Sequence, residues 1–319
     1  MLYDFGSVFL GLVLLLAGGD LLVRGAVSLA LRLGIPALIV SLTIVALGTS
    51  APELLITVQS VIEGAPGLAL GNVVGSNVAN VLLVLGLPAI LTAIHPGDGD
   101  SRRTFLMMIA TTAIAIFLCF MGPLAFWHGV VLLGMFVALI WDAIRTASSG
   151  RSARAQPEAD TLAELEHANP HLPPFRIAAL IVGGLVLLPL GANFLVDGAV
   201  RIAAGFGVSD AVIGLTIVAI GTSLPELATS VSAALRKQTD VALGNVIGSN
   251  MFNILAILGV ASLFGPLDVP AHFLSVDLWV MLGCSLLLYP FVFRGWCISR
   301  GWGIALISLY GLYILTLVV

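Results

Sequence analysis

Apolar stretches of helix length recur along nearly the whole chain and constrain its fold more than any other feature. A transmembrane helix needs about 20 mostly apolar residues. The sequence offers ten such stretches, near residues 3–20, 36–62, 66–92, 104–122, 125–146, 175–193, 209–236, 240–264, 273–293 and 301–319. Only 9% of the residues are charged, against roughly 25% in a soluble domain. The pattern predicts an all-α polytopic membrane protein with ten transmembrane helices.

The polar residues exclude several classes of protein. Thirteen Lys and Arg residues against 17 Asp and Glu residues give a net charge of −4, so there is no basic surface for nucleic acid. The three cysteines, Cys119, Cys284 and Cys297, lie in or beside apolar runs without a metal-ligand spacing. We therefore expect a lipid bilayer as the surroundings, and no nucleic acid, resident cofactor or obligate protein partner.

The chain contains an internal repeat. A shift of 173 residues aligns residues 18–86 with 191–259 without a gap, and 32 of the 69 positions are identical. Two polar motifs recur: TIVALGTSAPEL (43–54) as TIVAIGTSLPEL (216–227), and GNVVGSNVAN (71–80) as GNVIGSNMFN (244–253). Because each half holds an odd number of spans, the halves should be inverted relative to each other, as in many secondary transporters. A helix pair duplicated for packing alone would not need matching polar positions.

A polar segment separates the two halves. It is rich in Ala, Ser, Pro and charged residues, which is typical of a solvated linker. We predict a first five-helix repeat at 1–146, a linker at 147–174 and a second, inverted repeat at 175–319. With the N-terminus outside, 12 of the 13 Lys and Arg residues fall inside and only Arg201 outside, in accord with the positive-inside rule. This predicts a multi-pass protein of the cell membrane with a cytoplasmic linker.

Glu53 and Glu226 are the only carboxylates expected in the middle of a span. An ionisable residue at the bilayer centre costs a few kcal/mol or more, and no Lys or Arg lies at a comparable depth. Bound cations or protons must therefore supply the compensating charge. A glutamate held permanently neutral is the alternative, but two symmetric copies make it a poorer explanation.

Hydroxyl and amide side chains accompany the glutamates at helical spacing. Four stripes spaced i, i+4, i+8 each place their side chains on one helix face: Thr49–Glu53–Thr57, Thr222–Glu226–Ser230, Asn72–Ser76–Asn80 and Asn245–Ser249–Asn253. A proline before each glutamate should kink the helix and free carbonyls near Ala46 and Ala219. Carboxylate, carbonyl, amide and hydroxyl oxygens are the ligands that Ca²⁺ and Na⁺ prefer. The stripes therefore predict a site for hard cations.

The charge of the two carboxylates indicates how such a site would exchange ions. One Ca²⁺ neutralises this charge, as do two monovalent ions or two protons, so the pocket cannot comfortably hold both loads. A neutralised pocket can switch sides, whereas a charged one is hard to move through the barrier. This favours an antiporter and not an enzyme, because an intramembrane hydrolase would need no stripes of oxygen ligands. A passive channel is a further alternative that a flux measurement would distinguish.

The repeated motifs resemble those of a known family. GTSAPELL with GNVVGSNVAN, repeated as GTSLPELA with GNVIGSNMFN, is similar to the paired alpha repeats of the sodium/calcium exchanger family, within the cation/calcium antiporters. The resemblance covers nearly the whole chain, and the short linker matches short, prokaryotic-type members. It implies two inverted five-helix repeats, a first and a sixth helix that slide across the core, and Ca²⁺ export driven by inward Na⁺ movement.

The resemblance also implies a ligand set for the transported ions. It comprises Glu53 and Glu226 with Thr49, Ser50, Thr222 and Ser223 beside them, Asn80 and Asn253 at the centre, and Ser76, Ser249 and the carbonyls of Ala46 and Ala219 at flanking Na⁺ sites. Several family members carry an aspartate at one of the two positions held here by asparagine, so this pocket carries less negative charge. Proton-coupled relatives have a glutamate after the Gly-Asn pair that this chain lacks, which favours Na⁺. A Ca²⁺/H⁺ antiporter that uses the same two glutamates is the alternative.

Overall fold

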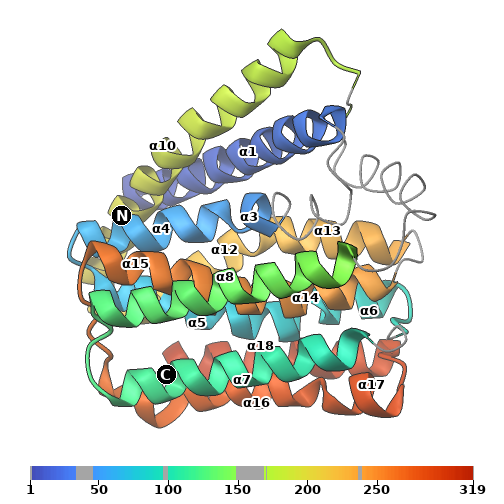
Figure 1. The fold of residues 1–319 in the computed structure, drawn as a ribbon. Coiled ribbons are helices and arrows are strands. Elements are labelled where there is room, and N and C mark those ends of the chain that lie inside the picture. The colour runs from blue at the N-terminus through green and yellow to red at the C-terminus, as the bar shows by residue number, and fades with distance from the viewer. Residues whose placement is uncertain are drawn as a thin grey trace.

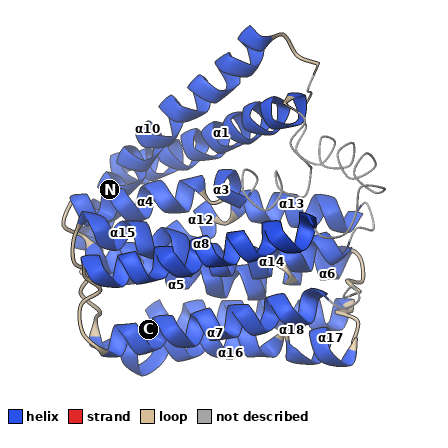
Figure 2. Ribbon diagram, viewed as in Figure 1, coloured by secondary structure: helices blue, strands red, loops and turns tan. Residues whose placement is uncertain are grey.

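The computed structural model describes residues 2–33, 46–95, 100–148, 169, 171–235 and 239–318. These residues form helices and no strand apart from two isolated bridges between loops (Figure 2). Within them, eight helical segments are long and apolar enough to cross a membrane, and two further apolar helices, Ala51–Ile62 and Phe126–Asp142, are shorter. The predicted all-α membrane class is confirmed, whereas the count of ten spans stays a prediction.

A similar order of helices occurs twice along the chain, with additional short segments in the second copy. The first copy comprises α1 (Leu2–Arg32), α3 (Ala46–Thr49), α4 (Ala51–Ile62), α5 (Pro66–Ala79), the π-helix η2 (Asn80–Val84), α6 (Gly86–Leu91), α7 (Asp100–Phe120) and α8 (Phe126–Ser148). The second comprises α10 (Pro174–Phe206), α11 (Asp210–Ile213), η3 (Gly214–Val218), α12 (Ala219–Thr222), α13 (Leu224–Leu235), α14 (Thr239–Phe252), η4 (Asn253–Ile257), α15 (Leu258–Phe264), η5 (Phe273–Asp277), α16 (Leu278–Leu287), α17 (Tyr289–Arg294) and α18 (Arg300–Val318). The sequence repeat is thus also a repeat of local structure. Most of the predicted linker, 149–168, and residues 36–45 of the second predicted span lie outside the described residues.

The long helices α1 and α10 form a pair that lies across the remaining helices (Figure 1). They contain 31 and 33 residues and so extend well beyond the apolar stretches predicted for them. Glycines bring their backbones together: a Cβ on Gly11 would lie 2.6 Å from the Leu195 nitrogen, and one on Gly198 would lie 2.9 Å from the Asp4 carbonyl oxygen. Small residues promote such close packing of membrane helices. The sequence prediction was too short because it counted apolar residues and ignored this packing.

The segments that carry the two glutamates are interrupted helices. Ser50 separates α3 from α4 with φ −90° and ψ 9°, and Ser223 separates α12 from α13 with φ −79° and ψ 3°. Pro52 lies in the first turn of α4, where its missing N–H has no intrahelical acceptor to lose. Pro225 holds the same place in α13. The predicted break before each glutamate is confirmed.

Close packing of α5 against η3 places the polar stripe of the first repeat beside the second repeat. A Cβ on Gly71 would lie 2.6 Å from the Ala211 carbonyl oxygen, and one on Gly214 would lie 2.6 Å from the Leu68 carbonyl oxygen. No side chain fits between these backbones. The equivalent of η3 in the first repeat lies at 41–45, outside the described residues.

Candidate cation-binding site

Both predicted glutamates lie in the interior of the molecule. Glu53 is 1% exposed and Glu226 is 0% exposed. Ser50, three residues before Glu53 at the same helix break, reaches the Glu226 carboxylate. The two repeats therefore contribute one carboxylate each to a shared centre, and neither carboxylate faces the lipid.

Each glutamate is contacted by hydroxyl groups of the other repeat. The Ser50 hydroxyl donates a hydrogen bond of 3.0 Å to Glu226 Oε1, and Thr49 also lies beside Glu226. In the opposite sense, Thr222 lies beside Glu53, although its hydroxyl donates to Asn72. These crossed contacts place the predicted threonines, one of the two predicted serines and both carboxylates in a single cluster.

Asn72 links the polar stripe of α5 to the helix that carries Glu53. Its amide nitrogen donates to the Glu53 carbonyl oxygen at 3.2 Å and to Thr57 Oγ1 at 2.9 Å. Its amide oxygen accepts a hydrogen bond of 3.2 Å from the Thr222 hydroxyl. Asn72 thus uses both ends of its amide within the protein and supports the site.

Asn245 makes the corresponding contacts in the second repeat. Its amide nitrogen donates to the Glu226 carbonyl oxygen at 3.4 Å and to Ser230 Oγ at 3.1 Å. The first asparagine of each stripe therefore joins the two helices of its own repeat. The first residue of each asparagine stripe therefore has a structural role, and only the remaining residues of the stripe are available as ligands.

Unpaired buried oxygens mark the centre of the site. Six buried side-chain atoms of the described residues have no hydrogen-bond partner: Glu53 Oε2, Glu226 Oε2, Asn80 Oδ1, Asn253 Oδ1, Ser223 Oγ and Tyr310 Oη. The first five belong to residues predicted as ligands. A buried polar atom without a partner costs about 1–3 kcal/mol, so each of these atoms calls for a partner that the described structure does not supply. Oxygens alone, with two carboxylates among them, suit a hard cation.

A third buried carboxylate has surroundings that differ from those of the two glutamates. Asp277, which ends η5, is 0% exposed. His272 Nδ1 lies 2.7 Å from its Oδ2, and the Tyr313 hydroxyl donates to its Oδ1 at 3.1 Å. Both oxygens of Asp277 are therefore satisfied by the protein, whereas each glutamate keeps one oxygen without a partner.

The serines predicted at flanking Na⁺ sites are buried. Ser76 is 0% exposed and its Oγ lies 3.4 Å from Thr222 Oγ1. Ser249 is 3% exposed. Ser76 therefore adjoins the cluster around the glutamates, as the resemblance implies, and its role toward an ion stays a prediction.

The Ala219 carbonyl is hydrogen-bonded, contrary to the expectation that Pro225 frees it. Its oxygen accepts the Ser223 N–H at 3.1 Å and lies 3.4 Å from the Thr222 hydroxyl. The reason is positional, because the N–H that Pro225 lacks would have reached the carbonyl four residues earlier, at Gly221. For Ala46, only its place at the start of α3 is described.

Two asparagines beside the site were missed by the sequence analysis. Asn77 and Asn250 are each 1% exposed. Asn253 donates a hydrogen bond of 3.0 Å to Asn77, and Asn80 donates one of 3.1 Å to Asn250. Both missed residues are identical in the two repeated motifs, but they fall outside the stripes from which ligands were chosen.

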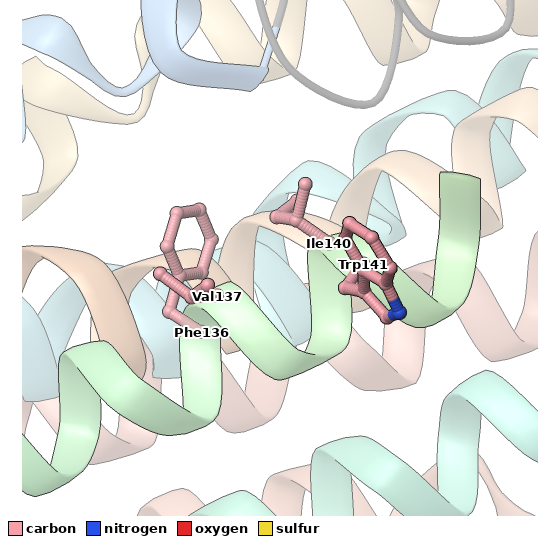
Figure 3. Close-up of a pocket in the computed structure, with 4 residues that line it drawn as sticks. All are labelled: Phe136, Val137, Ile140 and Trp141. Carbon is pink, nitrogen blue, oxygen red and sulfur yellow. The ribbon is translucent and has the colours of Figure 1, made fainter. Parts of the chain in front are cut away.

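Two further features of the described structure are candidates for a cation site, and neither is suited to one. The surface depression in Figure 3 is lined by Phe136, Val137, Ile140 and Trp141, all on α8, and contains no oxygen ligand side chain. No group of three or more His, Cys, Asp or Glu residues within the described ranges could hold a metal ion. The three cysteines are free thiols.

Comparisons with known proteins identify a family that this chain resembles. A family model described as sodium/calcium exchanger protein matches residues 3–144 and 176–319. The chain is 40% identical to the putative antiporter CaxA of Alkalimonas amylolytica over 88% of its length and 87% of that protein. It is 32% identical to the sodium/calcium exchanger MaX1 of Methanosarcina acetivorans over 98% of each chain. A structure of the exchanger NCX_Mj soaked with Na⁺ and Sr²⁺ matches with a TM-score of 0.68, 34% identity and 98% coverage of each chain.

Proposed function

The chain belongs to the sodium/calcium exchanger family, and from this premise we propose that it exchanges Ca²⁺ for Na⁺ across the cell membrane by alternating access. The observation that carries the proposal is the group of five buried oxygens without partners, contributed by Glu53, Glu226, Asn80, Asn253 and Ser223. The family is one of transporters, so we assign no enzymatic reaction. Ca²⁺ and Na⁺ are substrates and no resident cofactor is assigned.

The two carboxylates supply the charge that selects between ion loads. One Ca²⁺ balances Glu53 and Glu226 together, and the amide oxygens of Asn80 and Asn253 complete its oxygen shell. Na⁺ ions occupy positions beside the same carboxylates, where Ser76, Ser249 and the backbone carbonyls of Ala46 and Ala219 contribute. Thr49, Ser50, Thr222 and Ser223 contribute hydroxyl groups around the glutamates.

Competition for one pair of carboxylates couples the two ions. Burial of two unbalanced negative charges costs several kcal/mol per ion, so the change between inward and outward access is favoured only when a load is bound. Entry of Na⁺ removes the charge that holds Ca²⁺, and the reverse exchange follows the same rule. Exchange thus needs no energy source besides the ion gradients.

The duplicated elements supply the moving parts. We assign residues 1–146 and 175–319 to two inverted repeats of five spans, with the N-terminus outside and the 147–174 linker in the cytoplasm. The paired helices α1 and α10 slide across the helices that hold the ions. The support for this is the repetition of α3–α4 and α5–η2 as α12–α13 and α14–η4.

The decisive experiment measures which gradient drives Ca²⁺ movement. Purified protein is reconstituted in vesicles, and Ca²⁺ uptake is compared under an outward Na⁺ gradient, an outward H⁺ gradient without Na⁺, and neither gradient. We expect uptake with the Na⁺ gradient and none above protein-free vesicles in the other two conditions. Protein with both glutamates replaced by glutamine is the control for leak.

Each other outcome identifies a different function. Uptake driven by the H⁺ gradient without Na⁺ would show the Ca²⁺/H⁺ antiporter that uses the same two glutamates. Ca²⁺ uptake down its own gradient that depends on neither the Na⁺ nor the H⁺ gradient would show a passive channel. Either result overturns the proposed coupling.

A further inference from the structure

Four buried asparagines form a cluster where the two repeats meet. Asn77 and Asn80 belong to α5 and η2, and Asn250 and Asn253 hold the equivalent positions in α14 and η4. Each side chain is 1% exposed. Hydrogen bonds run across the repeats, from Asn253 to Asn77 at 3.0 Å and from Asn80 to Asn250 at 3.1 Å. The cluster is therefore symmetric in its contacts.

Backbone carbonyls fix the orientation of the first two amides. Asn77 Nδ2 lies 3.5 Å from the Asn250 carbonyl oxygen, and Asn250 Nδ2 lies 3.3 Å from the Asn77 carbonyl oxygen. A carbonyl oxygen can only accept a hydrogen bond, so the amide end that faces it must be the NH₂ group. Methionine sulfur atoms, also acceptors, face the same nitrogens, those of Met281 at 3.5 Å and Met108 at 4.0 Å. The oxygen of each of these two amides must therefore point the other way.

The orientation of Asn77 and Asn250 determines that of two predicted ligands, Asn253 and Asn80. Asn77 Oδ1 accepts from Asn253 Nδ2, and Asn250 Oδ1 accepts from Asn80 Nδ2. With its nitrogen held in this way, each second amide turns its oxygen away from the asparagine that holds it. These two oxygens, Asn80 Oδ1 and Asn253 Oδ1, are among the buried atoms that have no partner in the described structure. A continuous chain of donors and acceptors thus leads from the backbone to the ion ligands.

We propose that Asn77 and Asn250 are positioning residues, which hold the amide oxygens of Asn253 and Asn80 toward the transported Ca²⁺ without touching the ion. This inference rests on the proposed function and names residues that the ligand set leaves out. It also explains why the two central positions carry amides. The group there must donate to an amide oxygen and present an oxygen to the ion, and an ionised aspartate cannot donate.

A double-mutant cycle tests the proposal, because a residue that acts through another loses its effect when that other is removed. Asn77→Ala, Asn253→Ala and the double variant are reconstituted, and the KM for Ca²⁺ and the maximal rate are measured in Na⁺-driven uptake. We expect Asn77→Ala to raise KM about tenfold, the loss of one oriented ligand, with a much smaller change in maximal rate. In the Asn253→Ala background, Asn77→Ala should add less than about twofold.

The second repeat supplies the matched control. In the Asn80→Ala background, Asn77→Ala should keep its full effect, because Asn77 orients Asn253 and does not hold the Asn80 amide. The mirrored cycle, in which Asn250→Ala couples to Asn80→Ala and not to Asn253→Ala, provides an independent test if Asn77→Ala fails to fold. Size-exclusion profiles and thermal unfolding in detergent check the folding of every variant.

Two results would overturn the positioning role. One is an unchanged KM in folded Asn77→Ala and Asn250→Ala protein. The other is equal effects of Asn77→Ala in the Asn253→Ala and Asn80→Ala backgrounds, which a general packing role would produce. Failure of the proposed function is distinct, since wild-type vesicles would then show no Na⁺-driven Ca²⁺ uptake at all.

Discussion

The two halves of the site contain equivalent residues in different surroundings. The Ser50 hydroxyl donates to Glu226, whereas the equivalent Ser223 hydroxyl has no partner within the described residues. Asn72 is 0% exposed, and the equivalent Asn245 is only partly buried. Because the repeated motifs are nearly identical in sequence, the difference arises from how the halves pack and not from their chemistry.

Such inequality is what the proposed exchange cycle requires of a duplicated protein. If both halves had the same packing, the ions would be equally accessible from the two sides, and the protein would leak. Two packings of one motif, which the halves can exchange, provide two states that face opposite sides of the membrane. Substitutions at equivalent positions can show where the halves are equal and where they differ.

The largest expected effect concerns the two carboxylates, where the halves should be equal. Glu53→Gln and Glu226→Gln each keep the size of the side chain and remove a charged ligand. We expect Na⁺-driven Ca²⁺ uptake to fall by about 10- to 150-fold in either variant, if the lost charged interaction is worth about as much as a hydrogen bond to a charged group, about 1.5–3 kcal/mol. The exposed Glu63, at the end of α4, is the matched control. Uptake like that of the wild type in either variant would refute the shared centre.

The glycines of the α1–α10 pair should also respond equally. A Cβ on Gly11 would lie 2.6 Å from the Leu195 nitrogen, and one on the equivalent Gly184 would lie 2.7 Å from the Gly18 carbonyl oxygen. We expect Gly11→Ala and Gly184→Ala each to lower the free energy of unfolding in detergent by about 1–3 kcal/mol, as overpacking does. Gly6→Ala is the control, because no atom lies within 4 Å of a Cβ there. A neutral result at Gly11 would mean that the pair is loosely packed.

Much of the fold and the centre of the site could be predicted from sequence, because their causes are local. Prolines before Glu53 and Glu226 break the helices at Ser50 and Ser223, as expected. The burial of both glutamates followed from their place within apolar stretches and from the repeat. Apolar length alone did not predict the extent of α1 and α10, because those helices continue past charged residues such as Arg24 and Arg201.

The asparagine cluster shows why the rest could not be predicted. Asn77 directly follows Ser76, so it lies off the face that the stripe defines. Its importance comes from Asn253, which is 176 residues away. Helical spacing ranks residues within one helix and carries no information on which side chains meet across the two repeats. The one available signal was the identity of Asn77 and Asn250 in the repeat alignment.

Substitution of Asn72 and of the equivalent Asn245 should lower stability to different extents. Asn72→Ala removes the donor to the Glu53 carbonyl and Thr57 and takes from the Thr222 hydroxyl its nearest acceptor. We expect it to lower the free energy of unfolding by about 2–3 kcal/mol, the cost of buried groups without partners. Asn245→Ala should cost about 1 kcal/mol, because Asn245 is partly exposed and its bonds are longer. Chemical unfolding in detergent measures both, and equal losses would show that the described asymmetry has no energetic counterpart.

The smallest expected effect concerns the serines at the helix breaks, and it should depend on the ion. Without Ca²⁺ and Na⁺, Ser50→Ala should lower the free energy of unfolding by about 1 kcal/mol, the value of one hydrogen bond, because it removes the donor to Glu226. Ser223→Ala should not lower it, because it removes a buried hydroxyl whose missing partner already costs stability. Saturating Ca²⁺ should bring the two variants together if both hydroxyls then bind the load. A difference that persists at saturating Ca²⁺ would mean that Ser50 stabilises Glu226 in every state and that only Ser223 responds to the ion.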